Sequence, residues 1–405
     1  MKDNKIVFLL FLVALAIRVI YVYSLGSQEI GCWDEEGWEI AENIVSGNGY
    51  SMWVGVSDFV SARPWVFPFF LAGSILVFGP ALLPVEIMLS LFSSLGCILI
   101  YLIAKMIFGK KPALLAMLTA VFYPPFIYWN GKITPESLAI LLLLLAVYFL
   151  LRNKGGYLFN ALLSGVFLGA LAMTRSMAYG LIPLLAFWVF FTQKDKRRAL
   201  RQALIMVVAA GLLIAPWVIR NYALHKKIVL ASTEGGMTFY ATHNPEVLTK
   251  GGGDFYVLGL SSQEVAGLSE VQIDRHYYNK GLKFIKSHPA EYRKLLAGRF
   301  LRFWRFFPHT TDLPDSYNFK HILVMLFTDG PLIILGAIGL FLLAASRFSY
   351  ALLFALIIFN FNFVSVLIRS CIRYRTLIMP FLIILSAYAV YHYYLRIRSG
   401  YAARK

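Results

Sequence analysis

The chain has 405 residues, of which 59% are hydrophobic and 15% are charged, and its formal net charge is +17. Soluble domains carry about 25% charged residues, so this composition excludes a soluble protein and indicates a chain that crosses a membrane many times. The basic residues lie mainly in short runs between apolar stretches. The positive-inside rule explains this distribution, and we therefore expect no nucleic-acid partner.

Ten apolar stretches have the length of a membrane span. They are Ile6–Leu25, Val85–Phe108, Pro112–Tyr128, Glu136–Leu151, Tyr157–Met173, Met177–Phe191, Ala199–Trp217, His321–Ala345, Phe348–Ile368 and Tyr374–Leu395. The first has the charge pattern of a signal peptide but lacks a small-x-small cleavage site, so we expect an uncleaved first span.

An acidic segment follows the first span directly. The stretch Trp33–Glu39 carries the carboxylates of Asp34, Glu35, Glu36 and Glu39 in a chain that is otherwise apolar and basic. An idle charge at the rim of a bilayer costs several kcal/mol, so a carboxylate cluster there usually marks a substrate or ion pathway.

The short apolar stretch Trp65–Phe78 decides the topology. It begins after Arg63-Pro64 and contains Pro68 and Gly73. If it crossed the membrane, most of the later short basic loops would lie outside, against the positive-inside rule. We therefore predict an interfacial or re-entrant helix within a long first external loop, about ten spans, and both termini on the cytoplasmic side; an ordinary short span is the alternative.

The long external segment between Arg220 and Lys320 changes character midway. Its first part, up to Asp254, is rich in Gly, Asn and Thr and is predicted as irregular loop. From Ser269 to Trp304 the apolar spacing predicts two helices, broken at Ser287-His288-Pro289 with the proline opening the second. That second helix is aromatic and Arg-rich, which favours a position on the membrane surface over a grip on a lipid phosphate.

Several short motifs come in a fixed order along the chain. They are Trp33-Asp34-Glu35 with Gly47-Asn48-Gly49-Tyr50, Arg63-Pro64-Trp65, Thr134-Pro135-Glu136, Leu171–Arg175, Ala215–Asn221, Ser287–Tyr292 and Arg373-Tyr374-Arg375. This set resembles the polyprenyl-phosphate-sugar-dependent glycosyltransferases of the GT-C fold, in particular the protein-mannosyltransferase and aminoarabinose-transferase-like family (glycosyltransferase family 39-like).

The resemblance implies an all-α integral membrane protein with the GT-C fold. Residues 1–217 would form a seven-span catalytic module, with two juxtamembrane helices in the first external loop (26–84). Residues 218–320 would form a large, mostly helical external loop, and residues 321–405 a three-span bundle with a basic cytoplasmic tail. The charge argument reaches the same topology independently.

Transfer of a sugar from a lipid phosphate to a hydroxyl needs a base for the acceptor proton and cations for the leaving phosphate. The resemblance assigns the base to Asp34, with Glu35 as the second candidate. The alternative is that Asp34 only caps the helix that follows, since Asp is a favoured N-cap residue. Four acids within six residues exceed what a cap needs, so we favour catalysis.

A second carboxylate, Glu136, begins a span after Pro135. By resemblance it would face the same cavity and orient acceptor or sugar, while a plain helix-start acid is the alternative. Five arginines near external span ends are candidates for binding the donor phosphate, because the planar guanidinium binds two oxygens at once. They are Arg63, Arg175, Arg220, Arg373 and Arg375. Snorkelling to lipid headgroups is the alternative, weighed evenly for Arg220 and Arg375.

His243 and Asn244 follow Gly235-Gly236 and resemble the family's Gly-rich segment over the cavity, although a simple loop turn explains them as well. The histidines show no metal-ligand spacing and the three cysteines no disulfide framework. Some GT-C enzymes use a divalent cation, but this branch often does not. We therefore expect no cofactor and no essential metal.

We predict an inverting glycosyltransferase that moves a monosaccharide from a polyprenyl-phosphate donor to a hydroxyl of a lipid, glycan or protein acceptor. Its active site would be extracytoplasmic in a prokaryotic inner membrane, among membrane lipids. One alternative is a transporter or flippase of a lipid-linked substrate, which should carry ionisable groups near mid-membrane in broken helices. A structural or assembly subunit is a third alternative, against which the Asp34 cluster argues.

Overall fold

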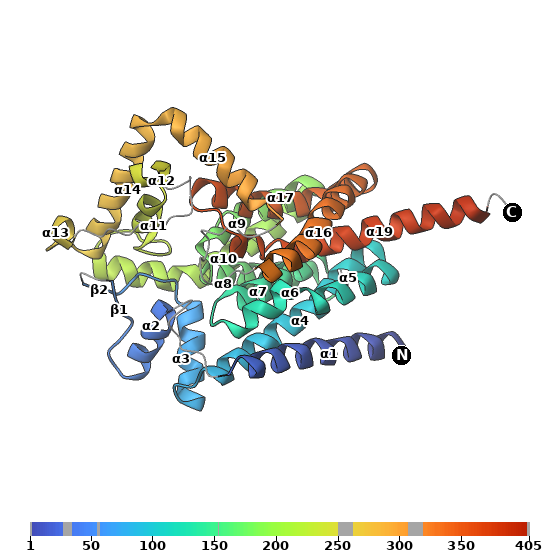
Figure 1. Cartoon of the computed structure of the whole chain (residues 1–405), viewed down its shortest axis with the longest axis horizontal. Coiled ribbons are helices and arrows are strands. Elements are labelled where there is room, and N and C mark those ends of the chain that lie inside the picture. The colour runs from blue at the N-terminus through green and yellow to red at the C-terminus, as the bar shows by residue number, and fades with distance from the viewer. Residues whose placement is uncertain are drawn as a thin grey trace.

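The computed structural model describes residues 2–26, 35–54, 57–152, 154–249, 262–306 and 319–402. These residues are almost entirely helical, with one short antiparallel pair of strands, β1 (Met52–Trp53) and β2 (Asp58–Phe59). Most long helices lie side by side along the longest axis of the molecule (Figure 1). The expected all-α architecture is confirmed.

The long helices form a bundle. They are α1 (Lys2–Leu25), α4 (Leu82–Phe108), α5 (Lys110–Phe122), α7 (Glu136–Leu151), α8 (Tyr157–Ala172), α9 (Leu181–Thr192), α10 (Lys196–His225), α16 (Phe319–Ser346), α17 (Phe348–Leu367) and α19 (Met379–Ala402). Within the described residues, five helices are long and apolar enough to cross a membrane, or six if the bent pair Lys110–Phe122 and Pro124–Gly131 forms one span. The predicted count of about ten spans stays a prediction.

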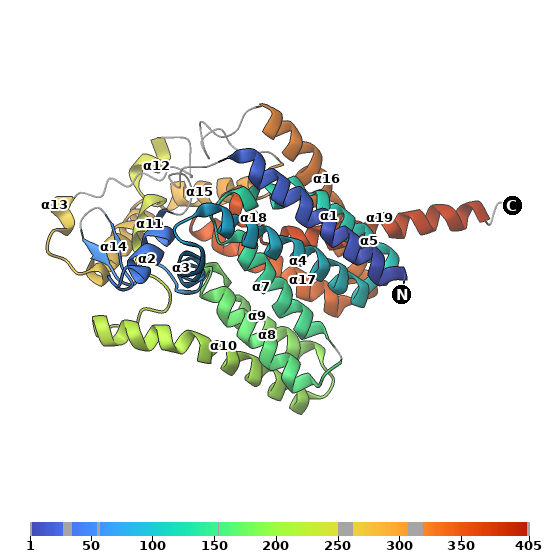
Figure 2. The ribbon, with the colours of Figure 1, turned by 90° about the horizontal axis from the view of Figure 1, so that it is seen from below.

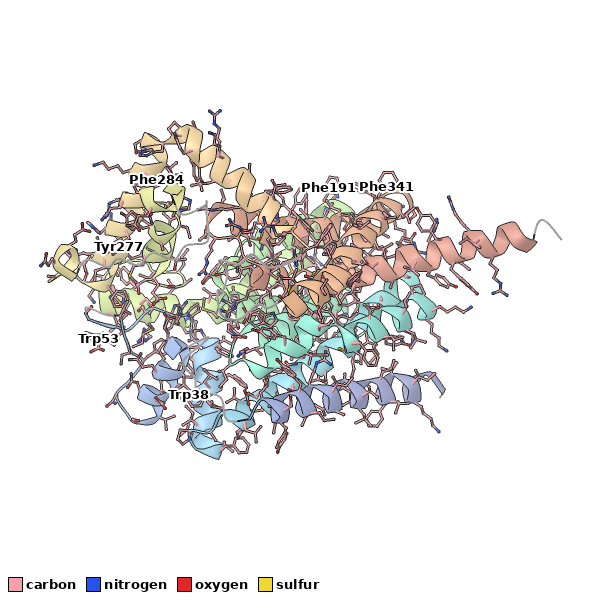
Figure 3. All side chains as sticks on the ribbon, in the orientation of Figure 1. Trp38, Trp53, Phe191, Tyr277, Phe284 and Phe341 are labelled. Carbon is pink, nitrogen blue, oxygen red and sulfur yellow. The ribbon has the colours of Figure 1, made fainter. Side chains whose placement is uncertain are left out.

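The outside of the bundle is apolar. Phe341 of α16 and Phe191 of α9 are 74% and 54% exposed and point away from the helices, as Figure 3 shows. By contrast, Tyr277 of α14 (Glu270–Ser287) is 1% exposed. A bundle that exposes large aromatic side chains in this way is suited to a lipid surrounding, so the chain is an integral membrane protein.

The connections between the bundle helices gather at two ends. At one end, the last residue of α1, Leu25, packs so closely on η1 (Trp129–Gly131) that a Cβ on Gly131 would clash with it. At the other end, Arg347, between α16 and α17, hydrogen-bonds the Ile107 carbonyl near the end of α4. Both chain ends shown in Figure 1 lie toward this second end. We call the first end the loop end and the second the basic end.

Two helices of the first loop lie at the loop end. α2 (Glu35–Val45) packs against α3 (Val66–Phe78), which runs across the direction of α1 rather than along it (Figures 1 and 2). The α3 N-terminus is held by the bond from Val66 N–H to the Met173 carbonyl, 3.2 Å. The predicted helix at Trp65–Phe78 is present as α3, and its position outside the spans stays a prediction.

The large loop contains α11 (Gly235–Ala241), α12 (Pro245–Thr249), α13 (Ser262–Val265), α14 and α15 (Pro289–Phe303). The two predicted helices and their break at His288 are confirmed as α14 and α15. The prediction of irregular loop before Asp254 is wrong, because α10 continues to His225 and α11 and α12 follow. Gly236 lets α11 approach α14 closely, since a Cβ there would clash with the Asp274 carbonyl.

A buried arginine supports the break between α5 and α6 (Pro124–Tyr128). Pro124 and Pro125 have no N–H, so the carbonyls of Ala120 and Val121, four residues earlier, lose their helical donors. Arg18 of α1 is 0% exposed and donates to both carbonyls at 3.2 Å. Its guanidinium thereby replaces the two missing backbone donors.

Candidate active site

A cavity of about 590 Å³ lies at the loop end, between the start of α3, the α8–α9 connection, the segment 228–238, α14 and the end of α17. The segment 228–238 is fixed to the first loop by two bonds, from Ser232 Oγ to the Ala62 carbonyl at 2.5 Å and from Thr233 N–H to the Ser61 carbonyl at 3.0 Å. The first loop and the large loop therefore form one wall.

Three arginines line this cavity: Arg63, Arg175 and Arg369. The bond that anchors the α3 N-terminus at Met173 brings the segment before α3 next to the α8–α9 connection, which explains why Arg63 and Arg175 line the same cavity. Arg63 forms ion pairs with Glu36 of α2 and, at 3.3 Å, with Glu234. The predicted convergence of Arg63 and Arg175 on one cavity is present.

Glu136 holds two arginines beside the cavity. It is 1% exposed at the start of α7, next to the cavity-lining Pro135. Its Oε1 pairs with Arg175 and accepts from Arg373 Nε at 2.6 Å, and its Oε2 accepts from Arg373 Nη2 at 3.1 Å. Because both arginines bind this one carboxylate, Glu136 orients cations rather than facing the cavity freely.

The cavity is also lined by acids and a phenol from the large loop: Glu234, Asp274 and Tyr278. Asp274 Oδ1 accepts a hydrogen bond from Gly236 N–H at 2.6 Å. Burial, with the neighbouring charges of Glu234 and Glu270, raises the pKa of Asp274 to about 6. Asp274 is thus a cavity carboxyl group that takes up a proton in mildly acidic solution.

Asp34, the predicted base, lies outside the described residues. The backbone of Glu35 begins α2, but its side chain also lies outside the described part. The described member of the acidic segment nearest to the cavity is Glu36, through its ion pair with Arg63. Gly37 of the same helix lines the cavity, so the first turn of α2 borders the site.

Two predicted phosphate-binding arginines lie away from this cavity. Arg220 donates to the Val60 carbonyl at 2.9 Å, and its guanidinium lies 5.2 Å and 4.9 Å from the ring centroids of Tyr50 and Trp217. Arg375 is 0% exposed and paired with Asp329 of α16. The geometry gives both arginines a structural role and does not bring them to the cavity.

His243 and Asn244 do not line the cavity either. His243 is 0% exposed, stacks on Phe239 with ring centroids 4.1 Å apart, and lies 3.0 Å from Arg299 Nη1. Burial and the Arg299 charge lower the pKa of His243 to about 3, so its imidazole stays neutral. Asn244 Oδ1 accepts from Val247 N–H at 3.2 Å and caps α12. These residues stabilise the packing of the large loop.

A Ser61–His225–Glu270 group near the cavity lacks the geometry of a catalytic triad. Ser61 Oγ and Glu270 Oε1 both approach the same imidazole nitrogen, Nε2, at 2.9 and 2.6 Å, whereas a triad needs the carboxylate at Nδ1. No group of three or more His, Cys, Asp or Glu side chains in the described residues is placed to hold a metal ion. Metal independence stays a prediction.

Four charged residues of these clusters were not predicted from the sequence: Arg369, Glu234, Asp274 and the buried Asp329. Arg369 carries the same signal as the arginines that were chosen, a cation at an external span end. Glu234 and Asp274 carry no such signal, because the large loop contains other acids and only folding brings these two to the cavity. Asp329 lies inside the predicted span His321–Ala345, and an ionisable residue within a span is itself a signal of a special role.

Residues 62–219, less than half of the chain, match the family model described as dolichyl-phosphate-mannose-protein mannosyltransferase. No curated protein matches the chain significantly by sequence. Among solved structures, the apo oligosaccharyltransferase of Archaeoglobus fulgidus superposes with a TM-score of 0.63 at 13% identity, covering 99% of this chain and 52% of that chain.

The oligosaccharyltransferase AglB of the same organism, in complex with an inhibitory peptide and a dolichol-phosphate, gives a TM-score of 0.60 at 12% identity over 100% of this chain and 51% of that chain. ArnT from Cupriavidus metallidurans bound to undecaprenyl phosphate gives 0.47 at 12% identity, covering 95% and 77%. The chain spans about half the length of the oligosaccharyltransferases that it matches.

The comparisons therefore confirm the resemblance that the motifs indicate: the chain has the GT-C fold and is similar, over residues 62–219, to the protein mannosyltransferase family.

Proposed function

We propose that this protein is an inverting glycosyltransferase that takes a monosaccharide from a polyprenyl-phosphate donor and transfers it to a hydroxyl of a lipid, glycan or protein acceptor. The loop end would be extracytoplasmic in a prokaryotic inner membrane, with both termini cytoplasmic. The protein mannosyltransferase match and the dolichol-phosphate bound by the similar oligosaccharyltransferase support the donor class.

The observation that carries the proposal is the composition of the cavity wall. Arg63, Arg175 and Arg369 lie on the same cavity as the apolar side chains Phe67, Ile228, Leu230, Val364 and Ile368. A lipid phosphate has the same two parts, an anionic head that matches guanidinium groups and an apolar chain that matches an apolar wall.

In the proposed reaction the acceptor hydroxyl oxygen attacks the anomeric carbon of the sugar, opposite the phosphate. A bond forms from that oxygen to carbon, the bond from carbon to the phosphate oxygen breaks, and the phosphate leaves with the electron pair. A carboxylate takes the hydroxyl proton. Arg63, Arg175 and Arg369 stabilise the charge that develops on the phosphate, and Glu136 with Arg373 holds Arg175 in place.

We propose Asp34 as the base, with Glu35 as the second candidate, on the strength of the motif. Asp274 is a matched test of this assignment, because it is a carboxyl group on the cavity wall without support from a motif. Transfer of radiolabelled sugar from a polyprenyl phosphate in purified membranes should fall by roughly 10²- to 10⁴-fold in Asp34→Asn. It should fall less than about tenfold in Asp274→Asn. The reverse order would move the base to Asp274.

One observation favours the transporter or flippase alternative: Asp329 is an ionisable residue inside a predicted span. Its carboxylate is 1% exposed, however, and is bound by Arg375 and by Tyr123 Oη at 2.6 Å. A substrate pathway requires accessible charge, which this closed group lacks. Movement of a lipid-linked sugar across vesicles without transfer would favour the alternative.

A further inference from the structure

A second cavity, of about 380 Å³, lies at the basic end of the bundle, whereas the candidate active site lies at the loop end. It is enclosed by the end of α7, the start of α8, the α9–α10 connection and the start of α17. Its lining includes Arg152, Tyr157, Trp188, Lys194, Arg198 and Tyr350. The proposed glycosyl transfer uses none of these residues.

The cavity is cationic. Arg152, Lys194 and Arg198 line it together with a single carboxylate, Asp195. The Asp195 carboxylate is already engaged as the N-cap of α10, where Oδ1 accepts from Arg197 N–H at 3.0 Å and from Arg198 N–H at 3.1 Å. The described residues therefore place three positive charges against one negative charge, an excess that favours an anion.

The backbone of Arg152 and the side chain of Arg198 are each held by a neighbouring residue. The Arg152 carbonyl accepts a hydrogen bond of 2.7 Å from Asn160 Nδ2, and Asn160 is 1% exposed. The Arg198 guanidinium lies over the Tyr157 ring, 4.4 Å from its centroid. A guanidinium that lies flat on an aromatic ring directs its N–H groups outward in its own plane, where an anion can accept from them. Because the side chain is already held in place, it loses less entropy when the anion binds.

Hydrogen bonds connect the helices that line this cavity. Trp188 is 7% exposed and donates from Nε1 to the Ser349 carbonyl at 2.6 Å, which joins α9 to α17. Gln193 Nε2 donates to Gln202 Oε1 at 2.5 Å across the α9–α10 turn. A general excess of basic residues at this end of the protein would need no such cavity, so the bonded helices around it favour a specific site.

Apolar side chains near the cavity indicate the source of the anion. Phe191, just before Thr192 and Gln193, is 54% exposed, Leu158, after Tyr157, is 40% exposed, and Leu200 of α10 is 49% exposed. Acyl chains beside the bundle would contact these residues while a phosphate reached the arginines. A soluble phosphate compound would leave this apolar surface unused.

We propose that the basic-end cavity binds the phosphate group of an anionic membrane lipid, with Arg152 and Arg198 as its principal ligands. Binding there would tie α7, α8, α10 and α17 together at the end opposite the candidate active site. Clusters of arginine and lysine between spans are suited to this role, because each cation near the surface adds to the attraction of anionic headgroups.

Native mass spectrometry of the full chain released from detergent tests this proposal. The probes are phosphatidylglycerol, which is anionic, and phosphatidylcholine, which carries a phosphate but no net charge. The wild-type protein should retain one phosphatidylglycerol at concentrations that leave phosphatidylcholine unbound. Arg152→Ala/Arg198→Ala should weaken this retention by roughly tenfold or more, because two cationic ligands are removed.

The matched control is Arg197→Ala/Arg201→Ala. It removes two positive charges as well, but both arginines lie on α10 outside the cavity lining. It should change retention less than about twofold. Equal losses in both double variants would overturn the proposal in favour of general charge attraction. Displacement of the lipid by an equal concentration of inorganic phosphate would overturn the lipid source. Gel-filtration profiles identical to wild type exclude misfolding as the cause of a loss.

Discussion

Two arginine–carboxylate clusters in this protein contain the same chemical groups in different surroundings. In the cavity cluster, Glu136 binds Arg175 and Arg373, whose side chains are 17% and 22% exposed. In the enclosed cluster, Asp329 binds Arg375, and both side chains are 1% exposed. Tyr123 and the carbonyls of Phe303 and Arg305 complete the enclosed cluster.

The difference shows that an ion pair acquires its role from what surrounds it. A buried pair that is held by further hydrogen bonds to neighbouring elements fixes the packing of those elements. An arginine that is bound on one side and open to a cavity on the other can still bind a ligand anion. Residue type alone does not distinguish the two cases.

The largest expected effect comes from opening the enclosed cluster. Asp329→Asn leaves the Arg375 charge buried without its counterion, so we expect the free energy of unfolding to fall by about 3–5 kcal/mol. Chemical unfolding in detergent, followed by tryptophan fluorescence, measures this change. The double variant Asp329→Leu/Arg375→Met removes both charges and should recover most of the stability. A single variant within about 1 kcal/mol of wild type would contradict the assignment.

The next effect separates an arginine that lines the cavity from one that does not. Arg63→Ala should lower kcat/KM for the donor by roughly 10²-fold, because a cation near the leaving phosphate is lost, with little loss of stability since its ion pair with Glu36 is partly exposed. Radiolabel transfer at varied donor concentration measures it.

Arg220→Ala is the matched variant. It should lower the free energy of unfolding by about 1–3 kcal/mol, because the Val60 carbonyl loses its donor, and should leave transfer per folded molecule unchanged. An equal loss of transfer in both variants would restore Arg220 as a phosphate ligand.

A smaller effect concerns pH and the acidic side of the cavity. The pKa of Asp274 is raised to about 6 from its ordinary value of 3.8, so between these values the folded state binds the proton more tightly than the unfolded state. This contribution to stability is full below pH 4 and is lost as the pH rises to about 6. Because Asp274 is partly exposed, we expect roughly 1–2 kcal/mol.

Asp274→Asn cannot ionise and should therefore lack this component. As the pH rises from 4 to 7, wild type should lose this component of its free energy of unfolding and Asp274→Asn should not. The stability of the variant relative to wild type should therefore increase. A difference that does not vary with pH would show that Asp274 titrates normally.

The smallest expected effect is that of chelation. The cations of the cavity are arginines, which need no metal to stabilise a leaving phosphate. Transfer measured after treatment with EDTA should therefore stay within about twofold of the untreated protein. Loss of transfer that returns with added Mg²⁺ or Mn²⁺ would replace this prediction with a metal-dependent site.

Several features followed from the sequence itself. Apolar length predicted the helices of the bundle, and the charges of the short loops predicted an interfacial or re-entrant helix at Trp65–Phe78. The number of spans and the side of each loop stay predictions. Helical spacing and the break at Ser287-His288-Pro289 located α14 and α15. Arg63 and Arg175, chosen as cations at external span ends, do line one cavity. These signals are local in the chain, which is why they could be read without a structure.

Tertiary structure decided which charged residues share a cavity. Arg369 and Asp274 reach it from segments about a hundred residues apart, while Arg375, two residues after the Glu136-bound Arg373, turns into the bundle to meet Asp329. Arg18 is held by carbonyls that Pro124 and Pro125 leave without donors, a relation over more than a hundred residues. The sequence determined where the apolar helices lie, because apolar runs act locally; packing between distant helices determined which charges are enclosed and which remain open to a ligand.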